Sequence, residues 1–365
     1  MYKIVTIIGA RPQFVKAAVV SREMQSQCTE IIVHTGQHYD YELSGAFFQD
    51  LAIPEPAYNL GIGSSSHGKQ TGEMLARLEE TLIAEQPDMV LVYGDTNSTL
   101  AGALVAVKLC IPIAHVEAGA RNFSLRIPEE VNRIITDRIS ALLFCATRTS
   151  ITNLEKEGIH EGVIFTGDVM LDLHARMRGA ASDDLSILEK LGVAPRQYLL
   201  GTVHRPRNTD IDERLCAIFE AFLEIKEPLV LPLHPRTLKH LKRTGLYERV
   251  AGASHIHLVK PLGYLDFMRL ELNARLIVTD SGGVQREAYF CQCPCVTLFH
   301  NTAWPETVKD GWNLLVDADK AQILTAVRDF QPTRPQRNVF GDGNAGAKIV
   351  KEIQHYLDHP RPIYI

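Results

Sequence analysis

Short runs of β-branched and other apolar residues recur along this chain, and each is followed by a turn and then by a segment with helical periodicity. Strands that alternate with helices predict an α/β fold with a parallel, doubly wound sheet. The runs are almost continuously apolar, as expected when helices cover both faces of the sheet. The expected strands are 4–8, 31–34, 89–93, 112–116, 141–145, 163–166, 198–203, 229–233, 256–259, 276–279, 295–298 and 314–316.

The alternation forms two series, which predicts two α/β domains, and 365 residues are enough for two separate cores. We expect residues 1–168 to form the first domain and residues 169–344 the second. The chain closes on a helical segment, and we expect residues 345–365 to pack back on the first domain. Residues 176–196 are rich in charges and turn formers, which predicts looser packing there.

Composition excludes several classes of protein. Apolar residues make up 45% of the chain, so intrinsic disorder is excluded. The net charge of −5 argues against a nucleic-acid partner. No apolar run reaches the ~18 residues of a membrane-spanning helix, and the N-terminal run is too short for a signal peptide. An odd count of seven cysteines favours free thiols in a reducing compartment, so we expect a cytoplasmic protein.

Three cysteines, Cys291, Cys293 and Cys295, alternate in the second half of the chain. This spacing could indicate a metal site. However, Pro294 interrupts the series and no second Cys/His pair stands nearby. We therefore expect buried structural thiols and no metal.

Chemistry in such folds sits at the carboxyl ends of the strands. The first strand is followed by Gly9-Ala10-Arg11-Pro12, where Gly9 permits a tight turn. Arg11 and Lys16 bracket the start of the next helix, and helix N-termini favour anions. The two cations either bind an anion or are solvated surface charges, and the sequence alone is consistent with both.

Carboxylates follow two further strands of the first half. Asp95 follows the third strand, although alone it could be only a helix cap. His115 and Glu117 are expected to project to the same face at the end of the fourth strand. Glu129 and Arg133 are four residues apart and are expected to share a helix face. Three acids near neighbouring strand ends predict a site for proton transfer.

The second half predicts a phosphate site. Asp280-Ser281-Gly282-Gly283 stands between a strand and a helix, where backbone N–H groups can cradle a phosphate. Glu287 lies one turn further on, where it can accept hydrogen bonds from ribose hydroxyls. His204 ends another strand and is either a ligand contact or a satisfied core residue. The residues thus predict a diphosphate nucleotide on the second domain and acid/base groups on the first, which suits a sugar nucleotide.

These motifs, in this order, resemble the non-hydrolysing UDP-N-acetylglucosamine 2-epimerases over nearly the whole chain. The resemblance implies the GT-B architecture, with two Rossmann-like doubly wound domains facing a central cleft. Three segments (8–14, 93–102 and 231–236) lean towards the branch acting on UDP-2,3-diacetamido-2,3-dideoxy-glucuronate. The matching motifs are Gly9-Ala10-Arg11-Pro12, Thr35-Gly36-Gln37-His38, Gly94-Asp95-Thr96, His115-Val116-Glu117-Ala118-Gly119, Pro128-Glu129-Glu130, Asn132-Arg133, His204-Arg205 and Asp280-Ser281-Gly282-Gly283-Val284-Gln285 with Glu287.

The resemblance implies C2 epimerisation by elimination of UDP, giving a 2-acetamidoglucal, and re-addition of UDP with proton delivery to the opposite face. It implies Asp95 and Glu117 as the proton-transfer pair, Glu129 as their partner, and His204 as an aid to UDP departure. It implies no metal and no other cofactor, a homodimer, and a role in polysaccharide biosynthesis. The residues that match nucleotide and phosphate contacts are Arg11, Lys16, Arg133, Ser281, Gly282, Gly283 and Glu287.

The chain departs from the family pattern at three places in its second half. Arg207 stands where relatives usually carry Glu, Gln292-Cys293 replaces Gly-Lys, and Phe299–Ala303 replaces Arg-Asp-x-Thr-Glu. Because of these departures, the resemblance does not predict which substituents the sugar carries or whether an allosteric UDP-sugar site is present. A hydrolysing 2-epimerase, a GT-B glycosyltransferase and a non-catalytic sugar-nucleotide sensor stay as alternatives.

Overall fold

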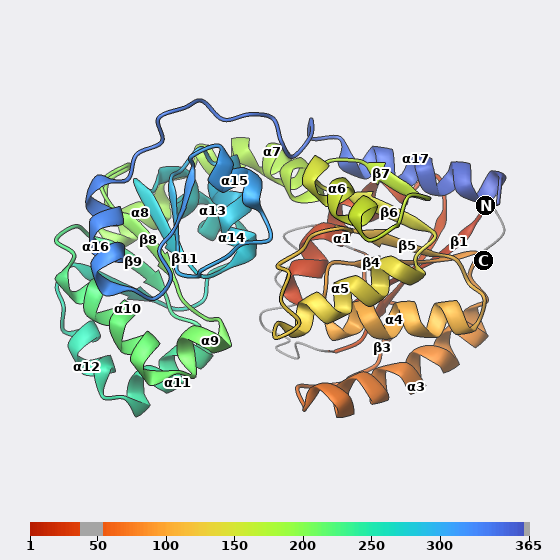
Figure 1. Ribbon diagram of the computed structural model, residues 1–365, viewed down its shortest axis with the longest axis horizontal. Helices are drawn as coiled ribbons and strands as arrows, with labels where there is room; N and C mark the ends of the chain where they lie inside the picture. The colour runs from red at the N-terminus through yellow and green to blue at the C-terminus, as the bar shows by residue number, and fades with distance from the viewer. Residues whose placement is uncertain (37–53, 361–365) are drawn as a thin grey trace. The chain divides into compact units, whose positions relative to one another are not determined.

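The computed structural model describes residues 1–36 and 54–360 (Figure 1); the side chain of Arg11 also lies outside the description. Gln37 and His38, which belong to one of the family motifs, lie outside the described residues. The chain divides into two compact units, residues 1–175 with 338–365, and residues 176–337.

The first unit contains a parallel sheet of seven strands in the order β3-β2-β1-β4-β5-β6-β7. Its inner strands are buried on both faces, which explains their continuous apolar sequences. The strands are β1 (Lys3–Ile8), β2 (Thr29–His34), β3 (Tyr58–Asn59), β4 (Met89–Tyr93), β5 (Ile113–Val116), β6 (Leu142–Cys145) and β7 (Val163–Phe165).

Helices cover both faces of this sheet (Figure 1). One face carries α1 (Arg11–Met24) and α17 (Ala345–Asp358), which pack against each other. The other face carries α3 (His67–Glu85), α4 (Asn97–Lys108) and α5 (Pro128–Ile139). The middle helix, α4, packs against both α3 and α5. The unit also contains α6 (Arg148–Lys156) and the start of α7 (Val169–Ser182).

The second unit has a parallel sheet of six strands in the order β10-β9-β8-β11-β12-β13. Its core is aliphatic with two phenylalanines, Phe219 and Phe222, in edge-to-face contact. The strands are β8 (Leu199–Thr202), β9 (Leu229–Pro232), β10 (Ile256–Val259), β11 (Leu276–Thr279), β12 (Cys295–Thr297) and β13 (Asn313–Leu315). The helices are α8 (Ser186–Leu191), α9 (Pro206–Thr209), α10 (Asp212–Glu224), α11 (Pro235–Arg243), α12 (Leu246–Ala251), α13 (Tyr264–Asn273), α14 (Gly282–Phe290), α15 (Pro305–Lys309) and α16 (Lys320–Asp329).

The predicted α/β class with two doubly wound sheets is confirmed, and each expected strand is present with small differences at its ends. The short strand β3 was not expected, because two residues carry no periodicity. The expectation of looser packing over 176–196 holds only in part, because most of the segment is exposed or half-buried but its helices are packed. This segment holds the end of α7 and all of α8, whose Ile187 and Leu188 are buried, and α8 packs on α13.

Both sheets reverse their strand order at one point, between β1 and β4 in the first unit and between β8 and β11 in the second. Loops that leave neighbouring strands at such a switch point diverge to opposite faces and open a crevice, where ligands of this fold class bind. Gly9 and Asp95 follow β1 and β4, and His204 and Ser281 follow shortly after β8 and β11. These four residues therefore lie at the switch points of their units.

Candidate active site

Two carboxylates of the first unit follow adjacent strands. Asp95 comes two residues after β4 and Glu117 directly after β5, and these strands pair with Tyr93 opposite Val116. Parallel pairing places both carboxylates at the same edge of the sheet. The structure thus brings together the two residues predicted to transfer protons.

Asp95 is held by an arginine from α5. Arg133 donates to the Asp95 carboxylate from Nε at 3.0 Å and from Nη2 at 2.5 Å. The same guanidinium donates to Glu130 at 2.9 Å and to Asn122 at 2.8 Å. Burial opposes the charge of Arg133, but the two carboxylates outweigh this effect and raise its pKa. Arg133 therefore stays a cation beside Asp95.

Glu129 is placed differently from the other two acids. It lies in the first turn of α5 and is exposed. The expected pairing along one helix face is made instead by Glu130, three residues before Arg133. Glu130 also accepts hydrogen bonds from the backbone N–H groups of Asn122 and Phe123, so it is a structural carboxylate. Its neighbour Glu129 is left facing solvent.

Glu117 forms a buried ion pair with Lys16. The two charged atoms are 2.7 Å apart, with 5% of the Lys16 and 8% of the Glu117 side chain exposed. Lys16 was predicted to contact the nucleotide, and the structure places it on the carboxylate instead of leaving it solvated. Arg11 begins α1, but its side chain lies outside the described part of the chain.

The expectation that His115 and Glu117 share a face is wrong. His115 binds Asp137 on α5, whereas Glu117 reaches Lys16 on α1, and these helices cover opposite faces of the sheet. Regular alternation ends with β5, because Glu117 has a left-handed backbone with φ of 74°. The sequence offered no signal for this conformation, which glycine usually adopts.

A glutamine missed by sequence reasoning fixes the turn after β1. The side chain of Gln13 accepts from the backbone N–H groups of Gly9 and Ala10 at 2.8 and 3.0 Å. It donates to the carbonyl of Tyr93 at 2.9 Å and to the Thr99 hydroxyl at 3.0 Å. Gln13 therefore connects the two strand ends at the switch point. Its position at the third residue of α1, a common capping position, was the available signal.

The second unit presents the predicted phosphate cradle at the start of α14. Ser281 is the N-cap and its hydroxyl accepts from the Val284 N–H. A side chain at Gly283 would meet only the Ser281 hydroxyl, at 3.7 Å. One at Gly282 would lie 3.3 Å from Nη2 of Arg205. Free backbone N–H groups at a helix start, with a guanidinium beside them, form a site for an anion.

Asp280 holds the loop that carries His204 against this cradle. Its buried carboxylate accepts from the backbone N–H groups of His204 and Arg205 and from the Asn208 side chain. The imidazole of His204 is 39% exposed. Sequence reasoning named Asp280 only as part of a motif and did not predict this role.

Glu287 lies on α14 and is 9% exposed. A second carboxyl, Glu271 on α13, is almost fully buried near it, and one of its oxygens has no hydrogen-bond partner among the described residues. Burial raises the pKa of Glu271 well above its usual range, and the charge of Glu287 raises it further. Burial thus favours the protonated form of this carboxyl beside the predicted ribose contact.

Two of the departures from the family pattern, Arg207 and Phe299, contact each other. Phe299 lies under the guanidinium groups of both Arg205 and Arg207, at 5.5 and 5.3 Å. Arg286 lies 4.1 Å from the ring of Trp304. Cys293 is buried, and burial raises the pKa of its thiol to about 12, so it is a core residue.

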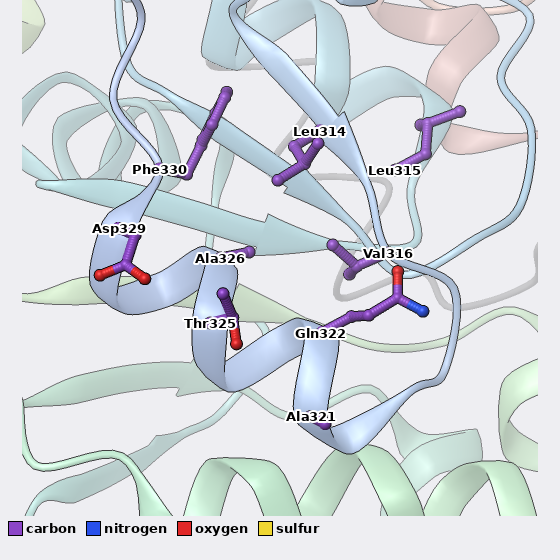
Figure 2. Close-up of a pocket in the computed structure, with 9 residues that line it drawn as sticks. All are labelled: Leu314, Leu315, Val316, Ala321, Gln322, Thr325, Ala326, Asp329 and Phe330. Carbon is purple, nitrogen blue, oxygen red and sulfur yellow. The ribbon is translucent and has the colours of Figure 1, made fainter.

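A separate cavity of about 440 Å³ lies between β13 and α16 of the second unit (Figure 2). Its walls are mainly aliphatic, with Asp329 and Gln322 at the margin. None of the predicted site residues lines it, so the cavity adds nothing to the candidate site. Among the described residues, no helix combines the length and apolar character needed to cross a membrane.

Comparison with known proteins identifies the family. The family model described as UDP-N-acetylglucosamine 2-epimerase matches residues 22–354. The chain belongs to the UDP-N-acetylglucosamine 2-epimerase family. The predicted family, fold and enzyme class, an isomerase acting on a carbohydrate, are thereby confirmed.

Relatives of this family fall on both substrate branches. A UDP-N-acetylglucosamine 2-epimerase homolog of Methanococcus maripaludis is 52% identical, over 97% of this chain and 99% of its own. A UDP-2,3-diacetamido-2,3-dideoxy-D-glucuronate 2-epimerase of Pseudomonas aeruginosa is 45% identical, over 96% and 98%. The crystal structure of Methanocaldococcus jannaschii UDP-GlcNAc 2-epimerase in complex with UDP-GlcNAc and UDP matches with a TM-score of 0.92 and 41% identity, over 97% and 99%.

Proposed function

We propose that this chain epimerises C2 of a UDP-2-acetamido sugar without hydrolysing it. In this reaction the C2 proton and UDP leave together across C1–C2, and the resulting 2-acetamidoglucal takes UDP back while a proton reaches the opposite face of C2. The observation that carries the proposal is the pair Asp95 and Glu117. Two carboxylates at one sheet edge, each paired with its own cation, provide two groups that can exchange protons.

The two carboxylates differ in burial, which supports different roles for the two acids. Glu117 and Lys16 are both more than nine-tenths buried, whereas 24% of the Asp95 side chain is exposed. We propose Glu117 and Asp95 as the proton-transfer pair and Glu129 as an accessory carboxylate. Which of the pair removes the proton and which returns it depends on the direction of the reaction.

The second unit supplies what UDP needs as a leaving group. The backbone N–H groups of Gly282 and Gly283, the Ser281 hydroxyl and the Arg205 guanidinium can stabilise the charge on the departing diphosphate. His204, with an exposed imidazole on a loop anchored by Asp280, is proposed to assist this departure. Glu287 is proposed to bind the ribose hydroxyls.

Proton NMR in D2O tests the proposal, with UDP-N-acetylglucosamine and, separately, its 2,3-diacetamido uronate analogue. We expect one of them to give the C2 epimer of the intact UDP-sugar, with deuterium at C2. Accumulation of free sugar and UDP would instead assign a hydrolysing 2-epimerase. Binding of UDP without any exchange would favour a glycosyltransferase or a sensor. The substrate that exchanges also decides between the two branches.

We further propose a cytoplasmic homodimer. The oligomer rests on the family resemblance, and light scattering on the purified chain tests it. The location is supported by seven free thiols, five of them buried, all within the described residues.

A further inference from the structure

Asp137, on α5, binds groups from two different strand-end turns. Its side chain is fully buried, with one carboxylate oxygen 2.7 Å from Nδ1 of His115. The other oxygen accepts from the backbone N–H of Gly119 at 3.1 Å and lies 2.7 Å from Nη1 of Arg121. Gly119 is in the turn that begins with Glu117, so Asp137 fixes the far side of that turn.

His115 extends this contact to the other turn. Its Nε2 lies 2.7 Å from the carbonyl oxygen of Gly94, the residue before Asp95. Gly94 is left-handed, with φ of 64°, so the direction of its carbonyl fixes how the chain enters Asp95. Both ring nitrogens of His115 face oxygen atoms. The carbonyl oxygen of Gly94 can only accept, so Nε2 of His115 donates to it, while Nδ1 contacts the Asp137 carboxylate.

The neighbours of Asp137 hold it as a carboxylate. Burial alone would raise the pKa of Asp137, but His115 and Arg121 outweigh it and hold the pKa below its usual range. Arg121 faces this carboxylate and also pairs with Glu157, through both oxygens at 2.7 and 2.8 Å. The Cys145 thiol on β6 is a further titratable group nearby, and burial raises its pKa.

One helix thus holds both acid/base turns. Arg133 and Asp137 are one turn apart on α5. Arg133 binds Asp95 directly, and Asp137 reaches the carbonyl of Gly94 through His115. We infer that Asp137 and His115 are positioning residues that set Asp95 and Glu117 relative to one another. The inference rests on the proposed function, because it assigns these residues to the distance between the two proton-transfer groups. Neither residue contacts the reacting atoms.

Asp137→Asn tests this inference, because it removes the charge and keeps the size. An error of about 1 Å between reacting groups costs about 100-fold in rate. We expect a fall in kcat of that order, with KM and UDP affinity within about twofold of the parent, and an altered pH profile of kcat. The matched control is Asp172→Asn. Asp172 is also a buried aspartate of the first unit and accepts from a glycine N–H, but that glycine, Gly346, lies on α17 and not in the turns after β4 and β5. We expect it to retain the parental kcat and pH profile.

A second variant and a spectroscopic readout keep the inference testable if Asp137→Asn does not fold. His115→Asn should lower kcat by a similar factor at unchanged UDP affinity. In protein labelled with 15N-histidine, the signals that this variant removes should report a proton on Nε2, the nitrogen that faces the Gly94 carbonyl. A ring without that proton, or parental kcat and pH profile in either folded variant, would overturn the inference. Failure of the proposed function would be distinguishable, because the parent protein itself would then show no exchange at C2.

Discussion

The ammonium group of Lys16 lies 2.7 Å from the carboxylate of Glu117, and the backbone that carries this carboxylate is left-handed. A non-glycine residue in that region costs about 1 kcal/mol or more, and it persists where its surroundings hold it. The N–H groups of Glu117 and Ala118 both donate to the carbonyl of Phe144 on β6. The neighbouring strand therefore directs Glu117 towards α1 and its lysine.

Replacing Glu117 by Gln should abolish deuterium incorporation at C2 and leave UDP binding unchanged. Gln keeps the shape but cannot take a proton, whereas the phosphate cradle lies in the other unit. NMR in D2O and titration calorimetry with UDP measure the two effects. Glu80→Gln, an exposed change on α3, serves as the control. Exchange at the parental rate in Glu117→Gln would remove this residue from the mechanism.

Lys16→Met should destabilise the protein by about 3 kcal/mol, because it leaves a buried carboxylate without its cation. Lys16→Arg keeps the charge and should retain more of the stability. Urea unfolding of both variants gives the comparison. Equal stabilities for Met and Arg at this position would mean that the ion pair contributes nothing to the fold.

Glu287→Ala should weaken UDP binding about tenfold, or about 1.4 kcal/mol, as expected for loss of hydrogen bonds to a charged group. At saturating UDP-sugar the rate of C2 exchange should change little, since the proton-transfer groups are untouched. Calorimetry with UDP checks the first statement and NMR the second. Glu248→Ala, an exposed change on α12 of the same unit, is the control. A parental affinity in Glu287→Ala would show that the ribose assignment is wrong.

Gly9→Ala should cost about 1–3 kcal/mol. A Cβ atom at this position would lie 2.1 Å from the Thr35 hydroxyl and 2.2 Å from that of Ser98, so the strand-end turns must move apart. Gly72→Ala on α3 meets nothing within 4 Å and should instead stabilise its helix by up to about 1 kcal/mol. Urea unfolding measures both, and the prediction requires opposite signs.

Glu271→Gln should stabilise the protein at neutral pH. The pKa of Glu271 is raised in the folded state by burial and by Glu287. Between the unfolded pKa, about 4.3, and the folded one, only the unfolded chain releases the proton, so the parent loses stability as pH rises through this window. Gln mimics the protonated form and avoids that loss. The free energy of unfolding of Glu271→Gln should exceed that of the parent at pH 7 but not at pH 4.

Most of the fold and part of the site could be predicted from sequence, because both depend on local pattern. Continuous apolar runs predict buried parallel strands, and the residues that follow these runs lie at the sheet edge where ligands bind. Asp95, Glu117 and Ser281 could be located in this way. The role of Asp280, and the contacts of Gln13 with Tyr93 and Thr99, could not be predicted, because these partners lie far along the chain.

The sequence by itself determined the strands, their order of appearance and the chemistry at their ends, since each depends on neighbouring residues. Only the tertiary structure decided which charges meet. Lys16 pairs with Glu117 although Glu23 is far nearer in sequence, and Arg133 reaches the distant Asp95 as well as its neighbour Glu130. It also decided that His115 turns inward to Asp137 and that Glu129 faces solvent. Such pairings follow from the register and crossing of distant elements, because a charge is paired by whatever the packing brings within a few ångströms.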